Sequence, residues 1–299
     1  MTGGDGAGDL LTWRQLWTDT ERVVGARHEA RWLCEHASGL DASEFLEALD
    51  EPATVRMVQH LDAMVARYRS GEPLAYVMGR WAFRHLDVMV DRRVLIPRPE
   101  TEQLVEVVLH CVQGAEFEGE PLCLADLGTG SGVIGLSLAH ELWRRQPEVW
   151  LTDASSDALD VARANLAGIG RAGGGVRVSQ GCWFEALPGD LRGRLHAVVS
   201  NPPYVAADDP ELDAAVREWE PSEALIAGDD GLDAVRHITA EAPHWLRAGG
   251  LLALEIGYRQ GQAVAALMEQ AGFVDVQVRP DLAGRPRIAL GRQPNRAAI

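Results

Sequence analysis

The chain has 299 residues, and 28 basic residues, all of them arginine, face 44 acidic ones, which gives a formal net charge of −16. Because the sequence contains no lysine, it excludes mechanisms that need an ε-amine, such as a P-loop lysine, a Schiff base or a lysine general base. The acidic excess also argues against a duplex nucleic acid partner, since such binding depends on cations that neutralise phosphates.

Targeting and redox signals are weak along the chain. The N-terminal stretch Met1 to Asp9 has neither a basic cluster nor an apolar segment, so we expect no signal peptide. No apolar run approaches the ~18 residues that a membrane span needs. The cysteines form no C-x-x-C pair, which is typical of reduced thiols rather than of a zinc site. We therefore expect a cytoplasmic, monomeric protein without a metal or a membrane anchor.

The N-terminal region reads as helical. Residues 10 to about 76 carry apolar side chains at helical spacing, and Asp41 and Ser43 are candidate helix N-caps. The pattern predicts a helical bundle over residues 1–76. A stabilising cap and a recognition domain are both compatible with such a bundle, because amphipathic stripes mainly form cores.

The pattern changes between residues 77 and 100. Apolar residues alternate there with polar ones at a period of two, which predicts a β-hairpin that links two domains. Pro97 and Pro99 then interrupt regular structure, and we expect the next helix to begin at Glu100 or Thr101.

From residue 122 onward, short apolar runs alternate with helical patterns. The predicted strands span 122–127, 149–152, 176–179, 197–200, 251–256, 274–278 and 287–290, and the predicted helices span 133–145, 156–168, 231–247 and 260–271. This alternation predicts an α/β fold with a mostly parallel sheet and helices on both faces. The last two strands lie too close for a crossover helix, so they should form an antiparallel hairpin at the sheet edge.

A glycine-rich segment, Asp-Leu-Gly-Thr-Gly-Ser-Gly at 126–132, follows the first of these strands and opens a helix. Glycines let the backbone approach a ligand, and a helix N-terminus offers free N–H groups. Asp153 ends the next strand, where a carboxylate can accept hydrogen bonds from ribose hydroxyls. These features are equally compatible with NAD, FAD or S-adenosylmethionine, and a plain glycine turn is the structural alternative.

The second motif is Asn201-Pro202-Pro203-Tyr204, directly after the fourth predicted strand. Open α/β sheets keep their sites at this end of the strands. The prolines hold the backbone extended, so the side-chain carbonyl of Asn201 and the backbone carbonyl of Pro202 can point the same way. Two adjacent acceptors suit one NH2 group, whose nitrogen then faces an electrophile. A rigid turn is the alternative, and the position after this strand favours function.

These motifs resemble the HemK/PrmC family, the protein-(glutamine-N5) methyltransferases that modify the GGQ glutamine of class 1 peptide chain release factors. The segments that carry the resemblance are 72–76, the hairpin, 94–102, 126–132, 201–204, 218–221, 255–257 and 281–285. The resemblance implies a seven-stranded, Rossmann-like class I S-adenosylmethionine-dependent methyltransferase sheet over 101–299, joined by the 77–100 hairpin to a bundle that recognises the release factor.

The resemblance also implies the site residues. Those for S-adenosylmethionine, with S-adenosylhomocysteine as product and no metal, are Gly128, Thr129, Gly130, Ser131, Gly132, Asp153, Trp183 and Asn201. Those for the substrate glutamine are Asn201, Pro202, Pro203 and Tyr204, of which Asn201, Pro202 and Tyr204 are catalytic. The chain departs from the family at Cys182, where an acidic residue usually stands as a candidate partner of the adenine amino group. A cysteine is a weak acceptor at best.

Other functions stay open. A ribosomal-protein glutamine N5-methyltransferase would share every motif, and an adenine N6 DNA or RNA methyltransferase would bind an NH2 group in the same way. The net charge of −16 counts against the nucleic acid substrate and against stable nucleic acid binding. A dinucleotide oxidoreductase or a non-catalytic cofactor-binding module leaves the segment 201–204 unexplained.

Overall fold

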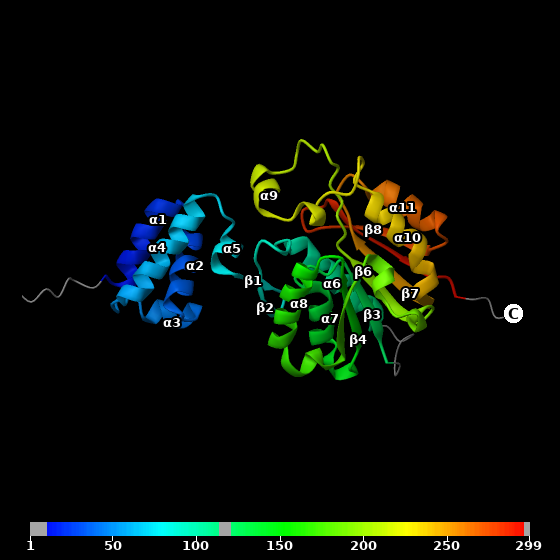
Figure 1. The fold of residues 1–299 in the computed structure, drawn as a ribbon, viewed down its shortest axis with the longest axis horizontal. Coiled ribbons are helices and arrows are strands. Elements are labelled where there is room, and N and C mark those ends of the chain that lie inside the picture. The colour runs from blue at the N-terminus through cyan, green and yellow to red at the C-terminus, as the bar shows by residue number, and fades with distance from the viewer. Residues whose placement is uncertain (1–10, 114–120, 296–299) are drawn as a thin grey trace, which may run out of the picture. The chain divides into compact units, whose positions relative to one another are not determined.

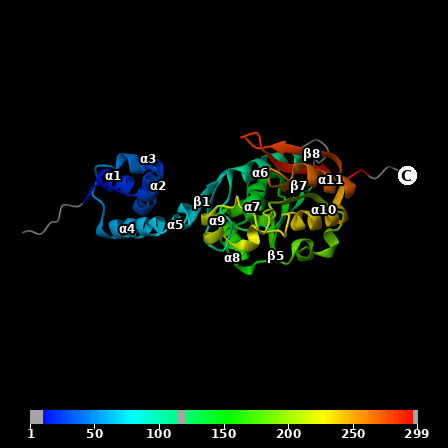
Figure 2. The ribbon, with the colours of Figure 1, turned by 90° about the horizontal axis from the view of Figure 1, so that it is seen from above.

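The computed structural model describes residues 11–113 and 121–295. The chain divides into two compact units between Gly79 and Arg80 (Figures 1 and 2). Residues 1–10 of the predicted bundle, and 114–120 and 296–299 of the predicted methyltransferase domain, lie outside the described part.

The described part of the first unit is built from helices. They are α1 (Trp13–Val24), α2 (Arg27–Ser38), α3 (Ala42–Glu47), α4 (Val55–Arg69) and α5 (Leu74–Met78). Asp41 is the N-cap of α3, because its carboxylate accepts from two backbone N–H groups, whereas Ser43 lies inside the helix and the prediction that it caps one was wrong. The side chains of Phe45, Leu33, Leu61 and Met64 fill the centre of this unit.

The second unit contains a seven-stranded sheet in the order β5-β4-β3-β6-β7-β9-β8. Its strands are β3 (Cys123–Leu127), β4 (Glu148–Asp153), β5 (Val176–Gln180), β6 (Leu195–Ser200), β7 (Leu246–Glu255), β8 (Val274–Pro280) and β9 (Pro286–Arg292). Strands β3 to β7 run parallel, while β9 is antiparallel to both of its neighbours. The prediction of a mostly parallel sheet with an antiparallel hairpin at its edge is confirmed.

Helices cover both faces of this sheet (Figures 1 and 2). On one face, α6 (Pro99–Val112), α7 (Val133–Glu141) and α8 (Ser156–Gly168) contact the strands. On the other, α10 (Asp233–Trp245) and α11 (Gly261–Gln270) pack against β7, β8 and β9. The short α9 (Ala214–Trp219) lies in the long connection after β6. Within the described residues, no helix is long and apolar enough to cross a membrane.

The predicted hairpin forms from β1 (Arg80–Phe83) and β2 (Leu86–Met89) and lies in the second unit, where β2 contacts α7 and α8. Asn165 on α8 holds it there, since its side-chain nitrogen donates to the carbonyls of both Met89 and Ser131. Helix α6 begins at Pro99, ahead of the predicted start. A proline fits the first helical position because the N–H that it lacks has no partner within the helix.

Candidate active site

The glycine-rich loop links the end of β3 to the start of α7. Gly128 and Gly130 have φ values of +68° and +54°, which are unfavourable for residues with a Cβ atom. A Cβ atom on Gly128 would lie 3.3 Å from the ring of Trp183. The backbone N–H of Thr129 donates to the carbonyl of Thr152 at 2.8 Å, so the loop is tied to the neighbouring strand β4.

Two aspartates hold this loop in place through hydrogen bonds. Asp126 Oδ2 accepts hydrogen bonds from the Thr129 hydroxyl at 2.6 Å and from the backbone N–H of Gly135 at 2.9 Å. Asp153 accepts from the N–H groups of Gly130 and Ser155, both at 2.9 Å, with one oxygen each. Each oxygen of the Asp153 carboxylate keeps a further lone pair for a ligand hydroxyl.

A cleft of about 690 Å³ opens above the carboxyl ends of β3, β4 and β6. Among the residues that line it are the predicted Gly128, Thr129, Gly130, Ser131, Asp153, Trp183 and Asn201. Gly132 is buried at the N-cap of α7, where a Cβ atom would come within 2.8 Å of Leu136 Cδ1. The structure therefore brings the predicted cofactor residues together, with Gly132 behind the loop rather than at the cleft.

Trp183 and Cys182 form one wall of the cleft. Trp183 has a φ of +48°, a conformation that is rare for a bulky residue and that often marks a functional site. It opens a short 3-10 helix over 183–186, in which Phe184 is buried against Trp245. The Cys182 side chain is exposed.

The segment 201–204 separates this cleft from a second one of about 390 Å³. Asn201 lines both clefts, Pro203 lines the larger one and Tyr204 lines the smaller one. The predicted residue Pro202 is buried and lines neither cleft. A ligand in the smaller cleft can therefore reach the larger one at Asn201.

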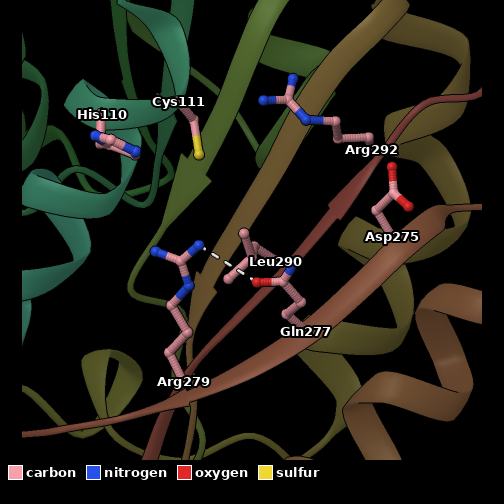
Figure 3. A pocket seen from close by; sticks show the side chains of 7 residues that line it. All are labelled: His110, Cys111, Asp275, Gln277, Arg279, Leu290 and Arg292. Carbon is pink, nitrogen blue, oxygen red and sulfur yellow. Dashed lines mark hydrogen bonds between the residues drawn. The ribbon is translucent and has the colours of Figure 1, made fainter. Parts of the chain in front are cut away.

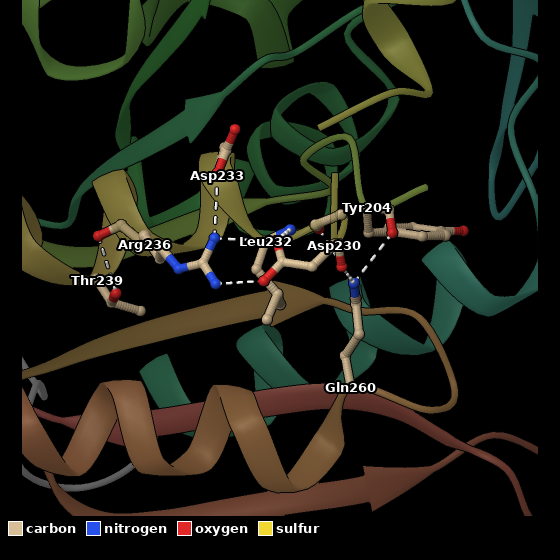
Figure 4. Close-up of polar contacts among 8 residues, drawn as sticks. Tyr204, Asp230, Leu232, Asp233, Arg236, Thr239 and Gln260 are labelled. Carbon is tan, nitrogen blue, oxygen red and sulfur yellow. Dashed lines mark hydrogen bonds and ion pairs between the residues drawn. The ribbon is translucent and has the colours of Figure 1, made fainter. Parts of the chain in front are cut away.

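Gln260 at the start of α11 holds the backbone beside Tyr204. Its Nε2 donates to the carbonyl of Tyr204 at 3.0 Å (Figure 4). The same nitrogen also donates to the carbonyl of Gly231 at 3.0 Å. Its Oε1 accepts from the backbone N–H of Gly257 at 2.9 Å. One side chain thus joins three loops at the carboxyl edge of the sheet, and no local sequence pattern marks it.

The segment that precedes α6 forms a further wall of the larger cleft, which the motifs at 126–132 and 201–204 did not indicate. Arg92 stacks its guanidinium over the Trp219 ring at 4.0 Å, and the buried Glu220 accepts from the backbone N–H of Ile96 at 3.0 Å. Glu220 also pairs with Arg98. The only signal for this wall was the family resemblance over 94–102 and 218–221.

Burial changes the acid–base properties of three groups at the site. It raises the pKa of Asp126 to about 7 and that of Glu255 to about 7, because both carboxyls are removed from water. Burial also raises the pKa of Tyr204, and the nearby Glu255 adds to the shift. The Tyr204 phenol is therefore neutral at physiological pH.

A further cleft of about 310 Å³ lies at the other end of α6, between His110 and Cys111 of that helix and strands β8 and β9 (Figure 3). It contains none of the predicted site residues. No cluster of three or more potential metal ligands occurs in the described ranges 11–113 and 121–295.

The sheet order, with β9 between β7 and β8, and the glycine loop beside the segment 201–204 form the arrangement expected of a methyltransferase. Comparisons agree: residues 107–224 match the methyltransferase small domain and residues 15–79 match the PrmC N-terminal domain. The delta-N METTL16 MTase domain shares the fold, with a TM-score of 0.51 at 15% identity over 80% of this chain and 95% of that one.

Curated relatives give the family. The release factor glutamine methyltransferase of Xylella fastidiosa (strain 9a5c) is 42% identical over 279 residues, which are 93% of this chain and 97% of the relative. The enzyme of the same description from Escherichia coli (strain K12) is 37% identical over 279 residues, with coverages of 93% and 96%. This chain belongs to the release factor glutamine methyltransferase family.

Proposed function

We propose that the protein transfers a methyl group from S-adenosylmethionine to the side-chain amide N5 of the glutamine in the GGQ motif of class 1 peptide chain release factors. The names of the relatives support the protein substrate. The observation that carries the proposal is the position of Asn201, which lines both clefts and so can meet a donor in one and an acceptor amide in the other.

The larger cleft fits S-adenosylmethionine. Its volume of about 690 Å³ is in the usual range for small-molecule sites. We assign the ribose hydroxyls to the free lone pairs of Asp153, the adenine to the wall at Trp183, and the amino acid end to the loop Gly128 to Ser131 at the start of α7.

S-adenosylmethionine supplies an electrophilic methyl group on a sulfonium centre. Asn201 Oδ1 and the Pro202 carbonyl accept the two N–H groups of the glutamine, and Tyr204 packs on the amide plane. With S-adenosylmethionine bound, these contacts would orient the amide nitrogen toward its methyl group, and this orientation by fixed dipoles would provide most of the rate. Formation of the N–C bond and cleavage of the C–S bond would make the nitrogen acidic, so that it would lose one proton to solvent.

We further propose that the helical unit recognises the release factor. The match to the PrmC N-terminal domain over 15–79 supports this role, and the unit has a hydrophobic core of its own. The partner is a protein, and we expect no stable complex with nucleic acid.

The proposed reaction is tested with labelled S-adenosylmethionine, purified release factor and a release factor whose GGQ glutamine is replaced. We expect label in the first protein only. Equal labelling of both would refute the assignment, and a ribosomal protein that competes better than the release factor would favour the sister activity.

The role of Asn201 is tested by Asn201→Ala. This substitution removes one of the two acceptors, so we expect kcat to fall by at least about 100-fold. Calorimetry should show that S-adenosylmethionine still binds. A near-wild-type rate in the variant would contradict the assignment.

A further inference from the structure

A chain of hydrogen bonds runs behind Asn201 and connects three separate elements. Asn201 Nδ2 donates to Thr101 Oγ1 of α6 at 3.3 Å, and Thr101 Oγ1 donates to Glu255 Oε2 at the end of β7 at 2.6 Å. The other oxygen of Glu255 accepts from the Tyr204 hydroxyl at 3.4 Å. Thr101 is 2% exposed and Glu255 is 1% exposed, so water does not compete for these bonds.

The direction of these bonds follows from the number of protons available. A threonine hydroxyl has one proton, and here that proton is used on the Glu255 carboxylate, which in its ionised form can only accept. The Thr101 oxygen can therefore only accept from Asn201, so it must meet the amide nitrogen rather than the amide oxygen. An asparagine carboxamide can otherwise turn over and exchange its two ends.

We propose that Glu255 and Thr101 are positioning residues that fix the orientation of the Asn201 carboxamide, so that its oxygen is presented to the N–H group of the substrate amide. The proposal rests on the proposed function, because it concerns how that site selects a donor. With the carboxamide reversed, Asn201 would present its own N–H groups to the substrate NH2, and two donors cannot bond to each other.

The same carboxylate also orients Tyr204, which lines the smaller cleft. The ionised Glu255 thus orients both Asn201, through Thr101, and Tyr204, the two side chains that we assign to the substrate amide. Protonated on Oε2, Glu255 would instead donate to Thr101, whose proton would then turn toward Asn201. The ionised form of Glu255 is therefore the active form.

This dependence on ionisation predicts a pH profile. Burial, the largest cause, and Glu100 on α6 raise the pKa of Glu255, whereas Thr101, Arg287 on β9 and Tyr204 lower it, and the net value is about 7. Because the neutral form predominates below that value, kcat should fall as the pH drops from 8 to 6, by about tenfold per pH unit once below the pKa.

The main test is Thr101→Val, which keeps the shape of the side chain and removes its hydroxyl. We expect kcat for glutamine methylation to fall about 100-fold, while the Kd for S-adenosylmethionine stays within about threefold. Thr101→Ser, which keeps the hydroxyl, should recover kcat to within about threefold. The matched control is Thr239→Val on α10, an equally buried residue whose hydroxyl, among the described residues, bonds only to carbonyls of its own helix (Figure 4).

A second variant, Glu255→Gln, tests the ionisation. Its carboxamide has a single oxygen and no charge, so the decrease of kcat between pH 8 and pH 6 should disappear. The proposal is overturned if Thr101→Val and Thr239→Val have the same kcat, or if Glu255→Gln keeps the wild-type pH profile. If Thr101→Val does not fold, the profile of Glu255→Gln decides alone.

Failure of the proposed function gives a different result. If the wild-type protein does not methylate the release factor glutamine, the function itself is wrong. If the wild-type protein is active and the variants behave as the control does, only the positioning role is refuted.

Discussion

We expect Asp126 to lower the stability of the second unit as the pH rises. Its carboxyl is fully buried, Oδ2 carries both of its hydrogen bonds, and Oδ1 has no partner in the described part of the chain. Burial raises the pKa of Asp126 from an ordinary value of 3.8 to about 7. A raised folded-state pKa means that the favourable contribution is complete below the unfolded-state value and is lost as the pH rises through the folded-state one.

The size of this loss follows from the two pKa values. A shift from 3.8 to about 7, at about 1.4 kcal/mol per unit, amounts to about 4 kcal/mol over the whole range. About 2–3 kcal/mol of this should be lost between pH 5 and pH 8. Asp126→Asn removes the charge and keeps an acceptor for Thr129 and Gly135. At pH 5 the neutral carboxyl has one unpaired donor on Oδ1 and the amide has two, so the extra donor should make the variant about 1–3 kcal/mol less stable than the wild type.

The prediction concerns the difference in the free energy of unfolding between the wild type and Asp126→Asn as the pH changes. Urea unfolding of the full chain at pH 5, 6, 7 and 8, followed by tryptophan fluorescence, gives this difference, and Glu255 contributes equally to both proteins. We expect the deficit of Asp126→Asn to close or reverse by pH 8, while the exposed Asp229→Asn follows the wild type. A deficit that stays constant from pH 5 to pH 8 would refute the reasoning about Asp126.

Two further outcomes concern Gly135, buried in α7 behind the glycine-rich loop, and Cys182 on the wall of the larger cleft. Gly135→Ala would place a Cβ atom 2.1 Å from Leu151 Cδ2, so this overpacking should lower stability by at least about 1–3 kcal/mol, measured by thermal unfolding. Cys182→Asp restores a carboxylate acceptor at an exposed position on the cleft wall, and S-adenosylmethionine should bind about fivefold more tightly by calorimetry.

The controls for these two variants come from the same unit. Gly168→Ala adds a Cβ atom in open space at the end of α8, so it should not destabilise the protein. Cys182→Ser keeps the size of the cysteine and lacks the carboxylate of Cys182→Asp. It should therefore leave the affinity for S-adenosylmethionine unchanged within about twofold. Equal melting of the two glycine variants, or equal affinity of the two Cys182 variants, would contradict these expectations.

Much of the second unit was predictable because its signals are local. The alternation of apolar runs and helical patterns predicts the strands of the sheet to within two residues of their observed bounds, since strand burial and helix periodicity are local signals. The exception is β7, which begins at Leu246, five residues before the predicted start. The start of α6 was missed because Pro99 was taken as an interruption. Steric restriction by proline excludes helix interiors but not the first turn.

The sequence predicted the parts of the candidate site that lie in continuous motifs, but not the contacts between distant residues. The loop 128–131 and the segment 201–204 were predicted because each is a continuous motif, and the structure places both at one edge of the sheet. Gly132 belongs to the same glycine pattern but serves the N-cap of α7, and only the packing against Leu136 distinguishes its role. The contact between Thr101 and Glu255 joins residues 154 positions apart, and spacing alone gives no access to such a pair.

The proposed methyl transfer is compatible with a chain that contains no lysine. Glu255, a buried carboxyl beside the segment 201–204, already receives the hydroxyls of Thr101 and Tyr204, so both of its oxygens are engaged in orienting protein groups. Such a carboxylate is poorly placed to take a proton from a substrate amide. Methyl transfer from a sulfonium does not require that step before attack, because the nitrogen becomes acidic only as it gains the methyl group. In the proposed mechanism the catalytic demand falls on fixed acceptor dipoles, and we assign these to Asn201 Oδ1 and the Pro202 carbonyl.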